Sequence, residues 1–265
     1  MNQRVKCFYA LVIFILAEAI QIVVSSILII LSGYLSATNS NVNGISQLDL
    51  SQNMRYLISA SSVLVCGIVF FALYIMETRG YKKERLITRS SVKMIISLIL
   101  LGLGCQLAVS GTMSMLQKIL VNLFEEYANQ IDSLHQGNAV VVFLLLAVIA
   151  PITEELIFRG VILHHTNRYI SFLGANLIQA TLFGIYHFNI VQGIYAAILG
   201  FLLGLVYHKF KTIIAPIILH MTVNISSYLI LVFPERLSSY FVMIFLGIGV
   251  IVIMIKSLKL YRIIE

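Results

Sequence analysis

The side chains of this sequence that could do chemistry are a few ionisable and amide groups within long apolar segments. An ionisable group inside a lipid bilayer is costly, and it is therefore a functional candidate by default. A carboxylate or imidazole can act as a general acid or base, and an amide can donate to a developing oxyanion. Such residues occur in three segments of the second half of the chain: Glu154, Glu155, Arg159, His187, His220 and Asn224.

The first segment contains two adjacent acids. On a helix, Glu154 and Glu155 point about 100° apart, so they cannot address one small site equally. Arg159 follows Glu155 by four residues, which is the spacing of a pair on one helix face. We therefore expect Glu155 to hold Arg159, and Glu154 to face the bundle interior as a candidate general base. The alternative is a charge cluster at the membrane edge, near Pro151 and Thr153.

The two segments that contain histidine also have helical spacing. His187 follows Phe183 by four residues, and Asn224 follows His220 by four, so each pair shares a helix face. His220 and Asn224 could together grip a metal ion, a water molecule or a developing oxyanion. The alternatives are that His187 is a packed core residue and that His220 and Asn224 make hydrogen bonds between helices.

Transmembrane helices must position these residues. The chain has 265 residues, of which 60% are hydrophobic and only 11% are charged, whereas a soluble domain has about 25% charged residues. A span needs about 20 mostly apolar residues. Candidate spans cover residues 8–31, 56–76, 94–116, 139–165, 171–187, 191–207, 213–233 and 240–255. We therefore predict an all-α, polytopic transmembrane bundle of about eight spans.

The net charge of +7 is explained by topology better than by nucleic-acid binding. With the N-terminus inside, nearly all of the 18 Lys and Arg residues lie in segments on the inner side. The exceptions are Arg55, Lys118 and Arg236. Cytoplasmic loops carry an excess of Lys and Arg, so we predict that both termini are cytoplasmic and that the chain has no nucleic-acid partner.

Three short motifs in these spans resemble those of a known family. Residues 154–159 read Glu-Glu-Leu-Ile-Phe-Arg, residues 183–187 read Phe-Gly-Ile-Tyr-His, and residues 220–224 read His-Met-Thr-Val-Asn. They correspond to the patterns EExxxR, FxxxH and HxxxN, in that order and on separate spans. The chain thus resembles the CAAX protease and bacteriocin-processing family (CPBP, also called ABI) of intramembrane proteases, which includes the type II CAAX prenyl endopeptidases.

The resemblance implies an intramembrane endopeptidase of the CAAX prenyl protease type. By motif, Glu154 and His187 would activate the water, while His220 and Asn224 would stabilise the oxyanion. The residues with supporting structural roles would be Glu155, Arg159 and Phe183. The hydrolysis would proceed by attack of the activated water on the scissile carbonyl.

The sequence is compatible with a metal-dependent and with a metal-free site. Family members are commonly described as metalloproteases, in which case Glu154, His187 and His220 would hold a divalent metal such as zinc, with Asn224 also near it. A metal-free mechanism based on glutamate and histidine is the alternative. Two histidines and one carboxylate suit zinc with an open position, but the sequence has no HExxH motif of the soluble zinc proteases.

The resemblance also implies partners and a location. The substrate would be a membrane-associated peptide or protein, the surroundings the lipid bilayer, and the location the cell membrane of a bacterium. The role would be peptide maturation, bacteriocin immunity or regulation of another membrane protein; prenylated substrates belong to the eukaryotic members. Two other functions stay open: a non-enzymatic scaffold or regulator that binds a partner membrane protein, and a proton-coupled transporter.

We divide the chain into three regions. Residues 1–138 form an N-terminal transmembrane region of three spans with no assigned role, in which Glu18 is unexplained. Residues 139–235 form the CPBP-like catalytic core, and residues 236–265 form the last span and a basic cytoplasmic tail. Gly200 and Gly204 form a GxxxG pair, which predicts close helix packing.

Overall fold

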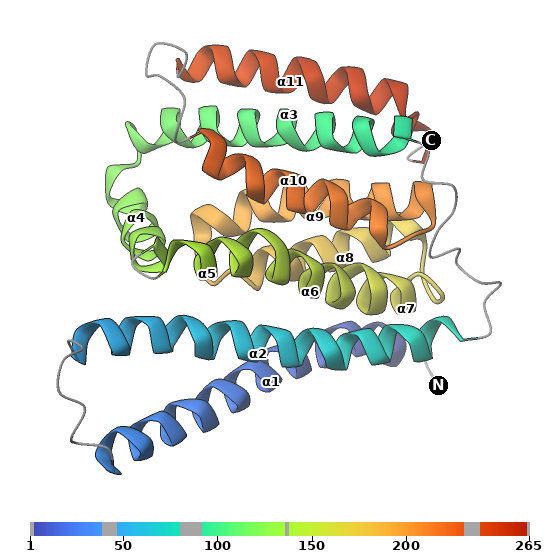
Figure 1. Cartoon of the computed structure of the whole chain (residues 1–265). Coiled ribbons are helices and arrows are strands. Elements are labelled where there is room, and N and C mark those ends of the chain that lie inside the picture. Colours follow the sequence, from blue (N-terminus) through green and yellow to red (C-terminus); the bar gives the residue numbers. More distant parts are fainter. Residues whose placement is uncertain (1–2, 39–46, 80–91, 136–137, 231–238, 264–265) are drawn as a thin grey trace.

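The chain folds into a bundle of helices that run roughly side by side (Figure 1). The computed structural model describes residues 3–38, 47–79, 92–135, 138–230 and 239–263, and within them it contains helices and no β-strand. The predicted all-α, polytopic bundle is confirmed. The main helices outside the central segment are α1 (Gln3–Thr38), α2 (Gln47–Thr78), α3 (Val92–Gln117), α4 (Val121–His135), α8 (Phe172–Ile185), α9 (Ile190–Phe210), α10 (Ile214–Ile230) and α11 (Tyr240–Ser257).

Six helices within the described residues are long and apolar enough to cross a membrane. They are Phe8–Tyr34, Met54–Thr78, Val92–Gln117, Ala139–Thr166, Ile190–Phe210 and Tyr240–Ser257. The predicted spans at residues 171–187 and 213–233 correspond to the shorter helices α8, of 14 residues, and α10, of 17 described residues. The count of eight spans and the orientation stay predictions. Most of the basic loop at residues 79–93, and Arg236, lie outside the described residues.

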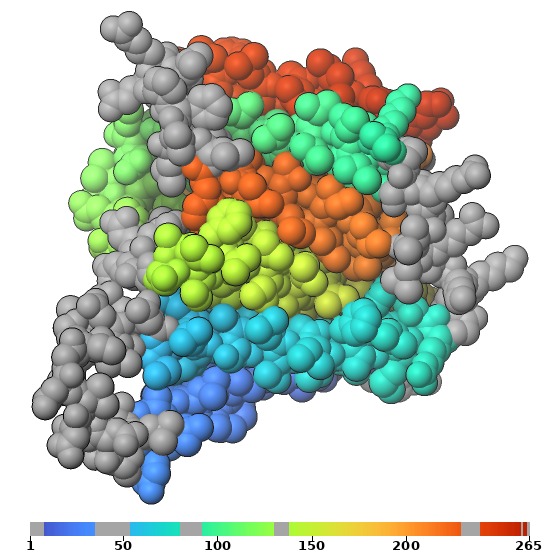
Figure 2. Space-filling view, in the orientation of Figure 1, coloured from blue at the N-terminus to red at the C-terminus, as the bar shows by residue number. Residues whose placement is uncertain are grey.

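The surface of the bundle is apolar where a soluble protein would be polar. On the outer helices, Ile30 is 72% exposed, Ile68 69% and Phe245 74%. Exposed side chains of this kind are expected where lipid is the solvent. Figure 2 shows α2 packed along the lower side of the central segment and α3 with α11 along the upper side of α10.

The central segment, Ala139–Thr166, carries the first motif and is not a regular α-helix. It is divided into α5 (Ala139–Leu144), η1 (Leu145–Ile149), α6 (Ala150–Glu155), η2 (Leu156–Leu163) and α7 (His164–Thr166), where η1 and η2 are π-helical. Pro151 stands in the first turn of α6. Proline lacks an N–H and clashes with the preceding turn, which disturbs a regular α-helical ladder. Wide π-helical turns are frequent at functional sites.

The N-terminal helices pack directly on this segment. Ala17 of α1 and Phe70 of α2 belong to the same buried cluster as Phe158 and Phe183 of the motifs. Thr153 approaches so closely that a Cβ added at Gly67 of α2 would lie 2.6 Å from its Oγ1 atom. Residues of α1 and α2 therefore form part of the wall around the motif residues.

Helices α8 and α9 pack closely against each other. A Cβ added at Gly204 would collide with Oδ1 of Asn176, and one added at Gly200 would lie 2.9 Å from the Phe183 ring. Asn176 donates to the Phe201 carbonyl at 3.0 Å. The GxxxG pair thus lets α8 approach the backbone of α9, as its sequence predicts.

Candidate active site

Glu155 joins two of the three motifs. Its Oε1 atom lies 2.9 Å from Nη1 of Arg159 and 2.8 Å from Nδ1 of His220. The predicted ion pair within the first motif is present, and the side chains of both partners are completely buried. Because an ionised carboxylate can only accept, Nδ1 of His220 carries the hydrogen of this bond. The bond therefore fixes the orientation of the His220 ring.

Glu154 lies at the opposite edge of the same ring. Its Oε2 atom is 3.7 Å from Nε2 of His220, and its side chain is 12% exposed. The spacing predicts that Glu155 holds Arg159 and that Glu154 faces the bundle interior. In the structure Glu155 also contacts His220, so both carboxylates lie beside this ring. The two acids point in different directions, but the imidazole has two nitrogens and lies between them. Only Glu154 has measurable exposure, and it is thus the carboxylate that water can reach.

Arg159 is completely buried, and both terminal nitrogens of its guanidinium are hydrogen-bonded. Besides the bond to Glu155, its Nη2 donates to the Gly200 carbonyl at 2.9 Å, and the guanidinium lies 4.7 Å from the centre of the Phe183 ring. Gln179 donates to the same carbonyl at 2.9 Å. A buried charge is tolerated only when it is paired and hydrogen-bonded. Arg159 thereby ties the first motif to the backbone of α9.

Phe183 lies between the two histidines of the motifs. Its ring is edge-on to His187, with centres 5.0 Å apart, and edge-on to His220, with centres 5.7 Å apart. His187 Nδ1 is 2.8 Å from the Phe183 carbonyl oxygen. A carbonyl only accepts, so Nδ1 donates and the lone pair of a neutral His187 is on Nε2.

Asn224 is anchored to the π-helical part of the central segment. Its Nδ2 atom donates to the carbonyl of Leu146, in η1, at 2.8 Å. The carbonyl partner fixes which end of the amide is nitrogen, and it leaves the second N–H of that nitrogen for another acceptor. Asn224 lies one turn after His220 on α10, and the described contacts do not join it directly to the two acids.

Sequence reasoning missed a contribution from α1. Gln21 donates to the Tyr186 hydroxyl at 2.7 Å, and Tyr186 is one of the variable positions of the FxxxH motif, next to His187. Glu18 precedes Gln21 by three residues, and its Oε1 is buried without a hydrogen bond in the described structure. The signal in the sequence was a pair of polar residues at helical spacing in an apolar span.

The residues as arranged do not fit a metal ion. Among the described residues, no group of three His, Cys, Asp or Glu side chains is placed to hold one. Glu154 lies 3.7 Å from Nε2 of His220. The Nδ1 atoms of His187 and His220 are bonded to a carbonyl and to Glu155, which leaves Nε2 of each ring as the nitrogen that would face a ligand. A zinc site therefore stays a prediction of the family resemblance, and no step of the mechanism below passes through a metal.

The fold and the site together define a class of protein: a multi-pass membrane protein with a carboxylate, imidazole and amide site inside its helical bundle. Comparison with known proteins supports this class. Residues 136–226 match the family model described as type II CAAX prenyl endopeptidase Rce1-like. These residues contain all three motifs, and the resemblance to the CPBP family is confirmed over this region.

A candidate membrane peptidase from Bacillus subtilis (strain 168), named YdiL, is also similar to this chain. The two are 26% identical over 167 residues, which cover 63% of this chain and 68% of YdiL. No solved structure matches the chain significantly. Both similarities support a membrane protease in general, and the substrate and the catalytic residues are proposed below.

Proposed function

We propose that this chain is an intramembrane endopeptidase that hydrolyses peptide bonds of a membrane-associated peptide or protein. The proposal rests on one observation: His220 lies between Glu154 and Glu155. These three residues belong to two of the motifs, and both motifs lie within the region that matches the family model. A scaffold protein would have no need for this buried set of ionisable groups, because each of them is costly to desolvate.

In the proposed mechanism, Glu154 is the general base. Its partly exposed carboxylate takes a proton from water, and the water oxygen attacks the carbonyl carbon of the scissile bond. His187 shares this role, because its Nε2 lone pair is fixed by the bond from Nδ1 to the Phe183 carbonyl. The proton then passes to the leaving nitrogen, and the C–N bond breaks to give an acid and an amine.

Asn224 and His220 are the proposed donors to the tetrahedral oxyanion. Because the Nδ1 hydrogen of His220 is already given to Glu155, His220 donates to the oxyanion only as the imidazolium, through Nε2–H. One N–H of the Asn224 amide donates to the Leu146 carbonyl, and the second N–H is the proposed donor to the oxyanion. Donors held in place before the reaction are the most effective, since they need no reorganisation as charge develops. The bonds from Glu155 to His220 and from Arg159 to Gly200 supply that rigidity, which is the proposed role of Glu155, Arg159 and Phe183.

The substrate is proposed only by class. The site lies among helices that carry an apolar outer surface, so a peptide with an apolar segment would reach it from the membrane. Peptide maturation and bacteriocin immunity are compatible with this class, and the Bacillus relative supports a bacterial cell membrane as the location. The described site residues give no reason to propose a prenylated substrate.

The test is a cleavage assay with Glu154→Gln. Wild-type and variant protein, purified in detergent and reconstituted in lipid vesicles, would be incubated with a library of synthetic apolar peptides, and products would be identified by mass spectrometry. The amide keeps the shape of Glu154 and removes the base, so cleavage should fall by about 100-fold or more. Glu125→Gln, the same change at an exposed acid of α4, should leave the rate unchanged.

Three results would contradict the proposal. Equal cleavage by wild type and Glu154→Gln would remove Glu154 from the mechanism. If wild type cleaved none of the peptides but retained some of them bound, a scaffold would be the better interpretation. A wild type that cleaved nothing and moved protons across the vesicle membrane would instead favour the transporter.

A further inference from the structure

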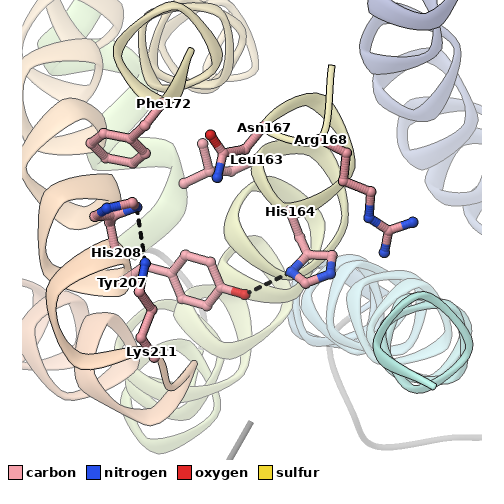
Figure 3. Close-up of a pocket in the computed structure, with 8 residues that line it drawn as sticks. All are labelled: Leu163, His164, Asn167, Arg168, Phe172, Tyr207, His208 and Lys211. Carbon is pink, nitrogen blue, oxygen red and sulfur yellow. Dashed lines mark hydrogen bonds between the residues drawn. The ribbon is translucent and has the colours of Figure 1, made fainter. Parts of the chain in front are cut away.

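A polar cavity lies among the end of the central segment, the start of α8 and the end of α9 (Figure 3). It has a volume of about 350 Å³. Its polar lining comes from His164, Asn167, Arg168, Tyr207, His208 and Lys211, and its apolar lining from Leu163 and Phe172. None of Glu154, Glu155, His187, His220 and Asn224 is among the residues that line it. The cavity is therefore separate from the proposed catalytic site.

The cavity is placed at the level of a membrane surface. The two candidate spans that form its walls, Ala139–Thr166 and Ile190–Phe210, both end there. It is also at the end of the bundle that the distribution of basic residues predicts to be cytoplasmic. Basic pockets between transmembrane helices on that side are typical binding sites for anionic lipid headgroups.

The lining is suited to an anion. No Asp or Glu is among the described residues that line the cavity. Lys211 Nζ lies 3.2 Å from Nδ1 of His208. An ammonium only donates, so that nitrogen accepts. The Tyr207 hydroxyl lies 3.3 Å from Nδ1 of His164. Figure 3 shows His208, Tyr207 and His164 along one side of the space.

Arg168 contributes charge more than direct contacts. In Figure 3 its guanidinium points away from the histidines, and its Nη1 lies 2.9 Å from Glu77 of α2. Glu77 also approaches His165, at 3.4 Å. The Glu77 carboxylate is thus held on the far side of Arg168, which leaves Lys211 as the main cation of the cavity.

The backbone at Lys211 gives independent support. Lys211 has φ 52° and ψ 35°, the left-handed conformation, and it caps the C-terminus of α9 through a bond from its N–H to the Tyr207 carbonyl. Glycine or asparagine is favoured at such a position, since other residues are strained there. A strained residue is a reason to look for a functional side chain, and here the side chain is the ammonium of the cavity.

We infer that this cavity binds the phosphate group of an anionic phospholipid. The phosphate would accept from Lys211, Asn167 and the Tyr207 hydroxyl, and the apolar surfaces of Leu163 and Phe172 would contact the glycerol and the start of the acyl chains. The volume is roughly ten times the share of one water molecule in the liquid, about 30 Å³. That space exceeds what a free phosphate fills and suits a glycerophosphate headgroup.

The test measures lipid retention by the full chain without any peptide substrate, so its result is independent of the proposed peptidase activity. Purified protein in detergent would be mixed with phosphatidylglycerol or phosphatidylcholine, and the bound lipid would be counted by native mass spectrometry. Lys211→Gly removes the ammonium and relieves the backbone strain, so the variant should fold at least as well as wild type. It should bind phosphatidylglycerol about fivefold more weakly.

The matched control is Lys209→Ala, which removes the same charge from an exposed residue outside the lining and should retain the lipid as wild type does. Three competitors would be added: inorganic phosphate, a peptide with a free terminal carboxylate, and the same peptide as its amide. None of them should displace the lipid. The inference would be overturned by equal retention of both lipids, by full retention in Lys211→Gly, or by equal loss in Lys209→Ala. Displacement by phosphate would assign the cavity to the free anion, and displacement by the carboxylate peptide alone to a peptide terminus.

Discussion

The buried ion pair of the first motif allows a quantitative prediction for Arg159→Met. Methionine approximates the length of the arginine stem but removes the bonds to Glu155 and Gly200 and the stacking on Phe183. Glu155 then stays buried with His220 as its hydrogen-bond partner. Breaking one side of a buried pair costs about 3–5 kcal/mol, because the other charge is left uncompensated. The folding equilibrium should therefore fall by roughly two to four orders of magnitude.

The double variant Glu155→Gln with Arg159→Met separates the charge from the packing. The Gln oxygen can still accept from His220, but no uncompensated charge is left in the core. The double variant should be more stable than Arg159→Met alone by at least about 1 kcal/mol, as expected for directly coupled residues. A simple additive loss would show instead that the pair acts only by filling space.

The assay is unfolding in detergent micelles with increasing dodecyl sulfate. The chain has no Trp and 13 Tyr residues, so the near-ultraviolet circular dichroism of tyrosine reports loss of tertiary packing. The control is Arg168→Met, which breaks the pair with Glu77 at side chains that are 25% and 17% exposed. That pair should contribute less than about 1 kcal/mol. A cost for Arg159→Met no larger than for Arg168→Met would refute the reasoning.

Two further predictions concern helix packing and the N-terminal helix. Gly204→Ala should destabilise the chain by about 1–3 kcal/mol, because the new Cβ collides with Asn176. The control Gly249→Ala, at a residue with open space around it, should not destabilise the chain. Equal melting temperatures of the two variants in detergent would contradict this prediction. Gln21→Leu should slow peptide cleavage about tenfold by leaving the Tyr186 hydroxyl without its donor. Gln106→Leu, which breaks a bond to Ser110 within α3, should leave cleavage unchanged, and an equal effect of both would reduce Gln21 to a structural residue.

Some features of the candidate site could be predicted from the sequence because helix geometry fixes them. Four residues on a helix bring two side chains onto one face, so the pairing of Glu155 with Arg159 follows from spacing alone. The same rule places His220 and Asn224 on one face of α10. Close approach of α8 and α9 likewise follows from two glycines, since a missing Cβ leaves room for a neighbouring helix.

Other features could not be predicted, because they depend on how helices rotate and pack. The bond from Glu155 to His220 joins residues 65 positions apart, and the bond from Gln21 to Tyr186 joins residues 165 apart. The length of α8 was also overestimated. Ser171 caps its start, and the chain leaves the helix after Ile185, shortly before the left-handed Phe188.

The sequence by itself determines that a few ionisable residues interrupt the apolar spans. Lipid excludes charge so strongly that each exception is visible without a structure. Only the tertiary structure decided that one imidazole lies between two adjacent carboxylates, that Arg159 is held by a carbonyl of another helix, and that Lys211 lines a basic cavity. Spacing along one helix is set by the backbone, whereas contacts between helices are set by the packing of all side chains at once.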